Sequence, residues 1–188
     1  LATQNPIESE GTYPLPDAQV DRFLMKIVVD YPSTGEEAAI VGRSLNPEVD
    51  VRELLSLDQL AQFSGLVEDV LVDRDVIAYA VAIADATRHP ERYGLRELGQ
   101  MIEYGASPRG PIGLVQAARA LALLRGRGYV AATDISDLAA DVLRHRIVLT
   151  YDALSDGIST DALLGKVLAA VPPPQAPPAS VGGRRRSG

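Results

Sequence analysis

Three polar side chains of this sequence stand where they could act on a phosphate group: Asn5, Arg22 and Arg109. Asn5 follows a short apolar segment and precedes Pro6. A neutral amide at the end of a strand can donate to a phosphate oxygen or orient a water molecule. Asn is also common in turns, and the local pattern by itself favours a plain turn at this position.

The two arginines have one chemical and one structural interpretation each. Arg22 stands just before an apolar run, from which a guanidinium can reach a neighbouring subunit and stabilise charge on a transferring phosphoryl group. The alternative is a surface ion pair with Asp17 or Asp21. Arg109 follows Ser107-Pro108 at an expected helix start, where it could clamp an anion. The alternative is a solvated arginine in a turn, at a helix end that disfavours cations.

The composition of the sequence argues against several classes of function, namely nucleic-acid coating, metal binding by Cys or His, and spanning a membrane. The net charge of −7 and pI near 4.8 argue against a protein that coats nucleic acid. The sequence has no Cys and only two His, which excludes thiolate metal sites and argues against a histidine metal centre. No apolar run approaches the roughly 18–20 residues that span a bilayer. No export signal opens the sequence, so we expect a cytoplasmic protein with no membrane span and no nucleic-acid partner.

Helical patterns dominate from residue 33 onward. Apolar residues recur at helical spacing after a series of capping residues. The expected helix starts are Ser33 or Thr34, Ser56 in a capping box with Gln59, Asp73 or Asp75, Ser107-Pro108, Thr133-Asp134, and Thr160. Gly126 is an expected helix stop. By contrast, residues 23–29 form a short apolar run with a β-branched end, which predicts a buried strand.

Two further segments are assigned structural roles. Arg144-His145-Arg146 is expected in the last turn of a helix, where cations are stabilised. Residues 172–188 are rich in Pro, Gly and Arg, and this composition predicts a disordered tail. Its three consecutive arginines are too few to indicate a nucleic-acid site.

Taken in order, these signals resemble the MoxR family of AAA+ ATPases. The resemblance is carried by Ala2-Thr3-Gln4-Asn5-Pro6, Glu10-Gly11-Thr12-Tyr13-Pro14-Leu15-Pro16 and Ala18-Gln19-Val20-Asp21-Arg22-Phe23. It continues in Gly105-Ala106-Ser107-Pro108-Arg109 and Val142-Leu143-Arg144-His145-Arg146-Ile147. The resemblance covers about residues 1–171.

The resemblance implies a role for each of the three side chains. Asn5 would be the sensor-1 residue that helps to place the attacking water. Arg22 would be the arginine finger that acts on ATP bound by the neighbouring subunit. Arg109 would be sensor 2, which ties the position of the lid to the nucleotide state. The family also implies ATP with Mg²⁺, a ring that is typically a hexamer, and remodelling or activation of client proteins, some with von Willebrand factor A domains.

The sequence departs from the family in one large respect. It contains no GxxxxGK[ST] loop, and no apolar strand ending in paired acids precedes Asn5. The resemblance therefore implies the C-terminal part of such an ATPase, mainly α in class, with the phosphate and Mg²⁺ ligands supplied upstream. The expected division is an end of the α/β P-loop NTPase core over 1–32, a helical lid over 33–171, and the tail over 172–188.

Without the upstream elements, we expect the chain alone to be inactive and the intact protein to be an ATP hydrolase. Two alternatives stay open at this stage. The helical part could be a non-enzymatic interaction module, in which the three polar residues would have no catalytic role. The chain could also resemble the ATPase subunit of magnesium chelatase, which has the same order of sensor residues and arginine finger. The motif Thr12-Tyr13-Pro14-Leu15-Pro16 favours the MoxR family over it.

Overall fold

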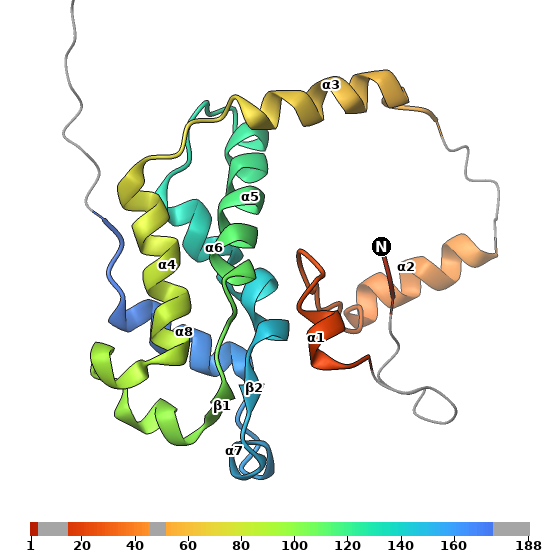
Figure 1. The fold of residues 1–188 in the computed structure, drawn as a ribbon. Helices are drawn as coiled ribbons and strands as arrows, with labels where there is room; N and C mark the ends of the chain where they lie inside the picture. Colours follow the sequence, from red (N-terminus) through yellow and green to blue (C-terminus); the bar gives the residue numbers. More distant parts are fainter. Residues whose placement is uncertain (4–14, 46–51, 175–188) are drawn as a thin grey trace, which may run out of the picture.

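The structure is a computed structural model, and it describes residues 1–3, 15–45 and 52–174. The expectations for Asn5 and for residues 175–188 lie outside this part of the chain. As the sequence predicts, the described residues form a mainly helical fold, and they also contain one small sheet (Figure 1). Among them, no helix is both long and apolar enough to cross a membrane.

Helices make up most of the described elements along the chain. The α-helices are α1 (Asp17–Val20), α2 (Thr34–Ser44), α3 (Leu57–Glu68), α4 (Arg74–Arg88), α5 (Arg109–Leu124), α6 (Ala132–Leu143), α7 (Tyr151–Ser155) and α8 (Thr160–Ala170). The 3₁₀ helices are η1 (Pro90–Tyr93), η2 (Arg96–Gln100) and η3 (Arg144–Arg146), and the strands are β1 (Ile102–Tyr104) and β2 (Val148–Leu149).

Side-chain caps start the first helices where the sequence predicts them. At α2 and α3, a serine accepts a hydrogen bond from the backbone three residues on, and the polar residue there bonds back to the serine N–H. The pairs are Ser33 with Glu36 and Ser56 with Gln59. At α4, the carboxylate of Asp73 accepts from the N–H of Asp75 at 2.8 Å. These caps satisfy N–H groups that a helix leaves open at its start.

The expected Thr133-Asp134 cap is wrong by two residues. Helix α6 begins at Ala132, so Asp134 lies inside the first turn and is fully buried. Its carboxylate accepts from the N–H of Ala131 at 2.8 Å and from the guanidinium groups of Arg125 and Arg127. Burial would raise the pKa of Asp134, but the bonds from Arg127 and Ala131 outweigh it and leave the pKa below its usual value. The tertiary ion pairs decide where this carboxylate sits.

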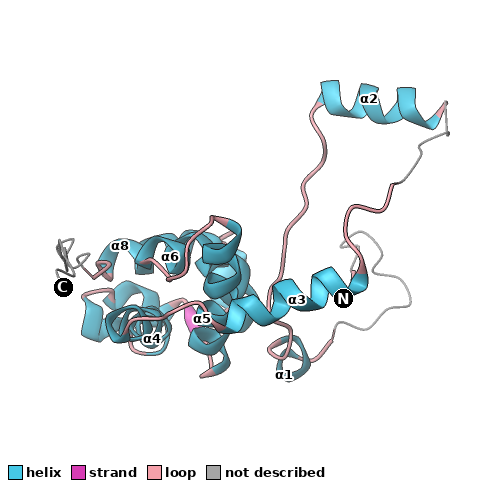
Figure 2. Cartoon of the chain, turned by 90° about the horizontal axis from the view of Figure 1, so that it is seen from above, coloured by secondary structure: helices cyan, strands magenta, loops and turns pink. Residues whose placement is uncertain are grey.

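The hydrophobic core lies between α4, α5, α6 and α8, which pack together in both views (Figures 1 and 2). Its largest fully buried side chains include Ile83 of α4, Leu114 of α5 and Ile135 of α6. Gly126, with φ +71°, ends the long helix α5 as expected. In contrast, α2 and α3 contain no buried residue, so their apolar stripes are not covered by the described residues.

The predicted strand over residues 23–29 is wrong for this chain. Residues 25–29 have no regular secondary structure, and Ile27 and Val29 are 70% and 87% exposed. A strand needs a neighbour to pair its backbone groups, and no described segment pairs along this run. The first part of the run is instead anchored by hydrogen bonds: the N–H of Lys26 donates to the carbonyl of Asp141 at 2.8 Å, and side chains of η3 donate to carbonyls of residues 23–26.

A short antiparallel pair, not predicted from the sequence, brings two distant loops together. Strands β1 and β2 pair Ile102 with Leu149 and Tyr104 with Val148. The chain just after β1 therefore runs beside the chain just before β2. These are the segment leading to α5 and the turn η3, which together carry most of the polar residues of the candidate site.

Close packing fixes the path of the segment that leads into α5. A Cβ atom on Gly105 would lie 2.5 Å from the carbonyl oxygen of Thr87, so only glycine fits here. The next residue, Ala106, is fully buried and donates its N–H to the hydroxyl of Thr87 at 2.9 Å. The hydroxyl of Thr87 donates in turn to the carbonyl of Ala84 at 2.7 Å. Helix α4 thus sets where Ser107 and Arg109 stand.

We expect Gly105→Ala to destabilise the chain by about 1–3 kcal/mol, because the new methyl group meets backbone atoms that cannot move away cheaply. Chemical denaturation measures the change in the free energy of unfolding. Gly165→Ala, in the middle of α8 with nothing within 4 Å of the added Cβ, is the matched control. It should stabilise by up to about 1 kcal/mol. Equal stabilisation in both variants would contradict the packing constraint.

Candidate functional site

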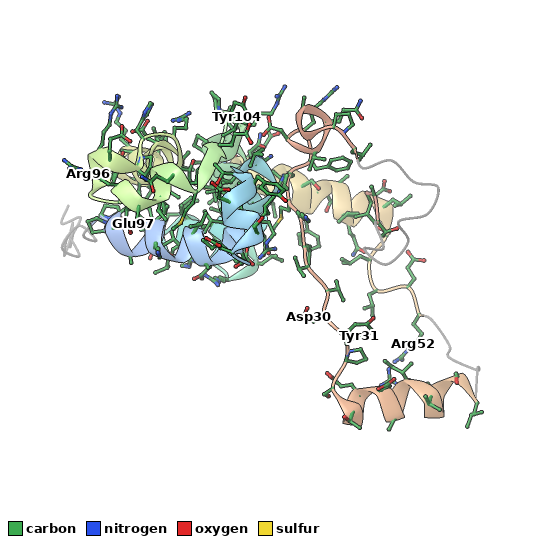
Figure 3. All side chains as sticks on the ribbon, turned by 90° about the horizontal axis from the view of Figure 1, so that it is seen from below. Asp30, Tyr31, Arg52, Arg96, Glu97 and Tyr104 are labelled. Carbon is green, nitrogen blue, oxygen red and sulfur yellow. The ribbon has the colours of Figure 1, made fainter. Side chains whose placement is uncertain are left out.

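The candidate site lies where the end of α1, the start of α5 and the turn η3 meet. Its residues come from three parts of the sequence: 21–24, 105–109 and 142–146. A shallow depression between them is lined by Asp21, Tyr104, Ser107, His145 and Arg146, among others. Figure 3 shows Tyr104 on the side of the helical body that faces this junction.

Asp21 is the carboxylate at the centre of the site. The hydroxyl of Ser107 lies 3.0 and 3.1 Å from its two oxygens, and the guanidinium of Arg109 donates to Oδ2 at 3.1 Å. The Nε of Arg146 lies 3.3 Å from Oδ1, within ion-pair distance but without hydrogen-bond alignment. Through its side chain, Asp21, the residue directly before Arg22, is therefore bound to both α5 and η3.

Ser107 organises the start of α5 as well as the contact with Asp21. Its hydroxyl accepts from the N–H of Arg109 at 3.2 Å, so it caps the helix from one residue before Pro108. The single hydroxyl proton remains for the carboxylate of Asp21. This arrangement confirms the helix entry expected at Ser107-Pro108.

The guanidinium of Arg146 donates hydrogen bonds to the backbone of residues 21–24. Its Nη2 donates to the carbonyl of Asp21 at 3.2 Å and to that of Phe23 at 2.6 Å, and its Nη1 donates to the carbonyl of Leu24 at 3.2 Å. Nη1 also contacts the carbonyl of Val142 at the end of α6. The side chain is only 3% exposed. Burial lowers the pKa of Arg146, and the carboxylate of Asp21 opposes this effect.

Two glycines of α5 make room for this buried guanidinium. A Cβ on Gly110 would lie 2.9 Å from Leu143 and 3.8 Å from the side chain of Arg146. A Cβ on Gly113 would lie 3.1 Å from Val142 and 3.5 Å from Leu24. Helix α5 therefore approaches α6 and residue 24 closely at both positions, which closes the space around Arg146.

His145 is a neutral partner of the same backbone turn. Its Nε2 lies 3.0 Å from the carbonyl of Phe23 and 2.7 Å from Nη1 of Arg146. Burial lowers the pKa of His145, and the nearby positive charge of Arg146 lowers it further, while the contact with Phe23 acts in the opposite direction. A second proton on the ring would set an imidazolium against a buried guanidinium.

A second arginine of the same turn anchors the chain further on. Arg144 donates to the carbonyl of Lys26 at 2.7 Å and pairs with Asp141 and Asp161. The turn predicted to be a cationic helix end thus has a different main role. It lies in the 3₁₀ turn η3 after α6, and its three side chains bind the backbone of residues 21–26.

The predicted site residues are only partly brought together. Arg109 is the first residue of α5, pairs with Asp21 and keeps 59% of its side chain exposed. Arg22 is exposed at the turn after α1, and the carboxylate of Asp21 pairs with Arg109 and Arg146 and not with Arg22. The Asp21 alternative for Arg22 is therefore wrong. The side chain of Asp17, the other alternative, is outside what the structure describes.

Sequence reasoning missed the two residues with the most polar contacts. Asp21 was considered only as a surface partner of Arg22, and Arg146 only as part of a cationic helix end. The available signal was their position inside the runs Asp21-Arg22-Phe23 and Arg144-His145-Arg146, but spacing alone does not show that residues over 120 positions apart meet. In the described ranges, no group of acidic or His side chains could hold a metal ion.

Because the pKa of folded His145 lies below that of an unfolded histidine, the unfolded chain binds more protons on acidification. We expect stability to be constant above about pH 7 and to fall as the pH drops below about 6.5. Thermal unfolding between pH 5 and 7.5 measures this. His145→Gln should flatten the slope, whereas His89→Gln, at a half-buried position outside the candidate site, should keep it. Equal slopes in wild type and His145→Gln would contradict the assignment.

Comparison with known proteins agrees with this architecture. Residues 98–167 match the family described as the AAA lid domain, and residues 1–25 match the ATPase family associated with various cellular activities. The chaperone MoxR1 of Mycobacterium tuberculosis is 46% identical over 175 residues, which cover 93% of this chain and 46% of that protein. The protein YeaC of Bacillus subtilis is 38% identical over 177 residues, covering 93% and 52%.

A solved structure shares the fold over nearly the whole chain. It is the crystal structure of a candidate ATPase from Cytophaga hutchinsonii, with 38% identity and a TM-score of 0.86, covering 92% of this chain and 53% of that one. The chain thus spans about half the length of the relatives it matches. With the lid matched from η2 to α8 and the end of the ATPase domain matched up to the Asp21 turn, the chain belongs to the MoxR family of AAA+ ATPases.

Proposed function

We propose that this chain is the lid-bearing part of a MoxR-type ATPase, which binds and hydrolyses ATP in a ring to remodel or activate client proteins. The observation that carries the proposal is the ion pair between Arg109 and Asp21. It joins the first residue of a lid helix to the residue directly before Arg22. A change in the position of the lid is thereby linked to the turn that carries Arg22.

The exposure of Arg22 supports its role as an arginine finger. A finger must reach a nucleotide held by another subunit, and therefore must not be committed to a partner in its own chain. Among the side chains that the structure describes, which do not include that of Asp17, none pairs with the guanidinium of Arg22, whereas the neighbouring Asp21 binds Ser107, Arg109 and Arg146. In the proposed ring, typically a hexamer, the backbone of residues 21–24 would be fixed and the guanidinium free to act.

The position of Arg109 supports its role as sensor 2. The N-terminus of the 16-residue helix α5 carries partial positive charge, to which the guanidinium of Arg109 adds. Because that side chain is 59% exposed, a phosphate oxygen can compete with Asp21 for it. Asn5, the proposed sensor 1, lies outside the described residues.

The proposed division assigns residues 1–32 to the end of the ATPase core, 33–171 to the lid and 172–188 to a tail. Phosphate and Mg²⁺ binding would fall to residues outside this sequence, which has no GxxxxGK[ST] loop. The proposed clients include proteins with von Willebrand factor A domains, and the proposed location is the cytoplasm.

In the intact protein, Arg22→Ala should lower the rate of ATP hydrolysis by about 10³-fold or more and leave ATP binding unchanged, because the guanidinium stabilises charge only in the transition state. Steady-state turnover and nucleotide titration measure the two quantities. Arg96→Ala is the control, since Arg96 is also exposed but lies across the helical body from the extended segment with Asp30 and Tyr31 (Figure 3). Unchanged turnover in Arg22→Ala would leave the interaction-module alternative.

The 188-residue chain alone should hydrolyse no ATP, because its sequence lacks the loop whose N–H groups and Lys hold the phosphates. A phosphate-release assay at millimolar ATP with Mg²⁺, with the intact protein as positive control, makes the measurement. ATP hydrolysis that stays with the purified chain through a further purification step would refute this expectation.

A further inference from the structure

Arg22 stands between two residues whose carbonyl groups are held by one guanidinium. Nη2 of Arg146 donates to the carbonyl of Asp21 at 3.2 Å and to the carbonyl of Phe23 at 2.6 Å. These are the residues on either side of Arg22. The carbonyl of Asp21 belongs to the peptide unit directly before Arg22, and the carbonyl of Phe23 belongs to the unit between Phe23 and Leu24. A side chain of the lid therefore restrains the backbone on both sides of Arg22.

The same guanidinium is fixed at its other end to the lid itself. Nη1 of Arg146 contacts the carbonyl of Val142 in the last turn of α6, and it also donates to the carbonyl of Leu24 at 3.2 Å. A movement of α6 must then carry residues 21–24 with it or break several hydrogen bonds at once. The turn and the end of α6 behave as one mechanical unit.

The burial of Arg146 shows that these contacts are not incidental. A guanidinium that is only 3% exposed loses its hydration, and an apolar side chain of similar volume would fill the same space at less cost. What an apolar side chain cannot do is donate to several carbonyls. The flat fork of arginine donates in fixed directions, whereas lysine offers one point charge.

We infer that Arg146 is the positioning residue for Arg22, an inference that rests on the proposed role of Arg22 as arginine finger. Because the Arg146 side chain is only 3% exposed and its guanidinium is taken up by backbone carbonyls, we assign it no contact with nucleotide or reacting atoms. It acts by holding the carbonyls of Asp21 and Phe23. It thus couples the position of the finger to the position of the lid of the same subunit.

The test is made in the intact protein with Arg146→Lys, which keeps the charge but not the fork. We expect the turnover number to fall at least about 10-fold, because small misplacements of a catalytic group have large costs. The affinity for ATP should be unchanged. Arg119→Lys is the matched control, since Arg119 of α5 also grips backbone carbonyls, those of Glu68 and Val70, but touches nothing in residues 21–24. Its turnover should match the wild type.

A double-mutant cycle separates positioning from general structural damage. If Arg146 acts through Arg22, then Arg146→Lys should have almost no further effect on turnover in a protein that already carries Arg22→Ala. Independent, multiplying losses in the double variant would overturn the inference. So would wild-type turnover in Arg146→Lys. Loss of turnover in Arg119→Lys of the same size would also overturn it, because the effect would then not be specific to the turn.

Failure of this inference is distinguishable from failure of the proposed function. The proposed function fails if Arg22→Ala alone leaves turnover unchanged. The inference fails if Arg22→Ala lowers turnover but the cycle shows no coupling with Arg146. If a lone lysine ammonium at this buried site lowers the melting temperature below the assay range, Arg146→Gln replaces it. This variant is neutral, offers a single amide NH2 group in place of the guanidinium fork, and is subject to the same cycle and the same outcomes.

Discussion

The buried guanidinium of Arg146 is the interaction on which the rest of the site depends. It lies between the segment 21–24 and the end of α6, and it binds carbonyls on both sides. Inside a protein, a hydrogen bond from a charged donor is stronger than between neutral groups, and breaking it leaves a buried charge unpaired. The segment therefore adopts an ordered turn even though it has no strand partner.

Close packing of small residues makes that contact geometrically possible. Gly110 and Gly113 let α5 approach α6, and Gly105 lets the preceding segment cross the backbone of Thr87. Pairing of β1 with β2 then holds the start of α5 beside η3. Three separate constraints thus converge on one small volume. The polar cluster around Asp21 is the result of how the helices pack, and not of any short motif within one element.

The sequence predicted what local chemistry determines. Caps at Ser33, Ser56 and Asp73 were located correctly, because a side chain and the N–H groups that it satisfies lie within three residues. The stop at Gly126 depends equally on one residue's backbone freedom. Prediction failed where distant partners decide. Asp134 was read as a cap because its two arginine partners were not considered, and residues 23–29 were read as a strand although no described segment pairs with them.

For the candidate site, the residue types were predictable but their relations were not. Arg22 and Arg109 were singled out from their neighbours in sequence, yet the carboxylate that connects them was seen only as a surface charge. Its importance arises from contacts with residues 86, 88 and 125 positions away. No periodicity encodes such contacts. Hydrogen bonds across that separation follow from the packing of α5 and α6, which only the folded chain specifies.

Under the proposed function, the site contains one cation that can exchange partners and one that cannot. Arg109 is 59% exposed, so its ion pair with Asp21 is screened by water and is worth at most about 1 kcal/mol. A phosphate, with more charge than a carboxylate, can displace it. Arg146 is 3% exposed and has no such alternative partner. When Arg109 turns to a nucleotide, Asp21 keeps Ser107 and Arg146. The finger-bearing turn thus stays joined to the end of α6 when Arg109 changes partner, so that a movement of the lid carries the proposed finger with it.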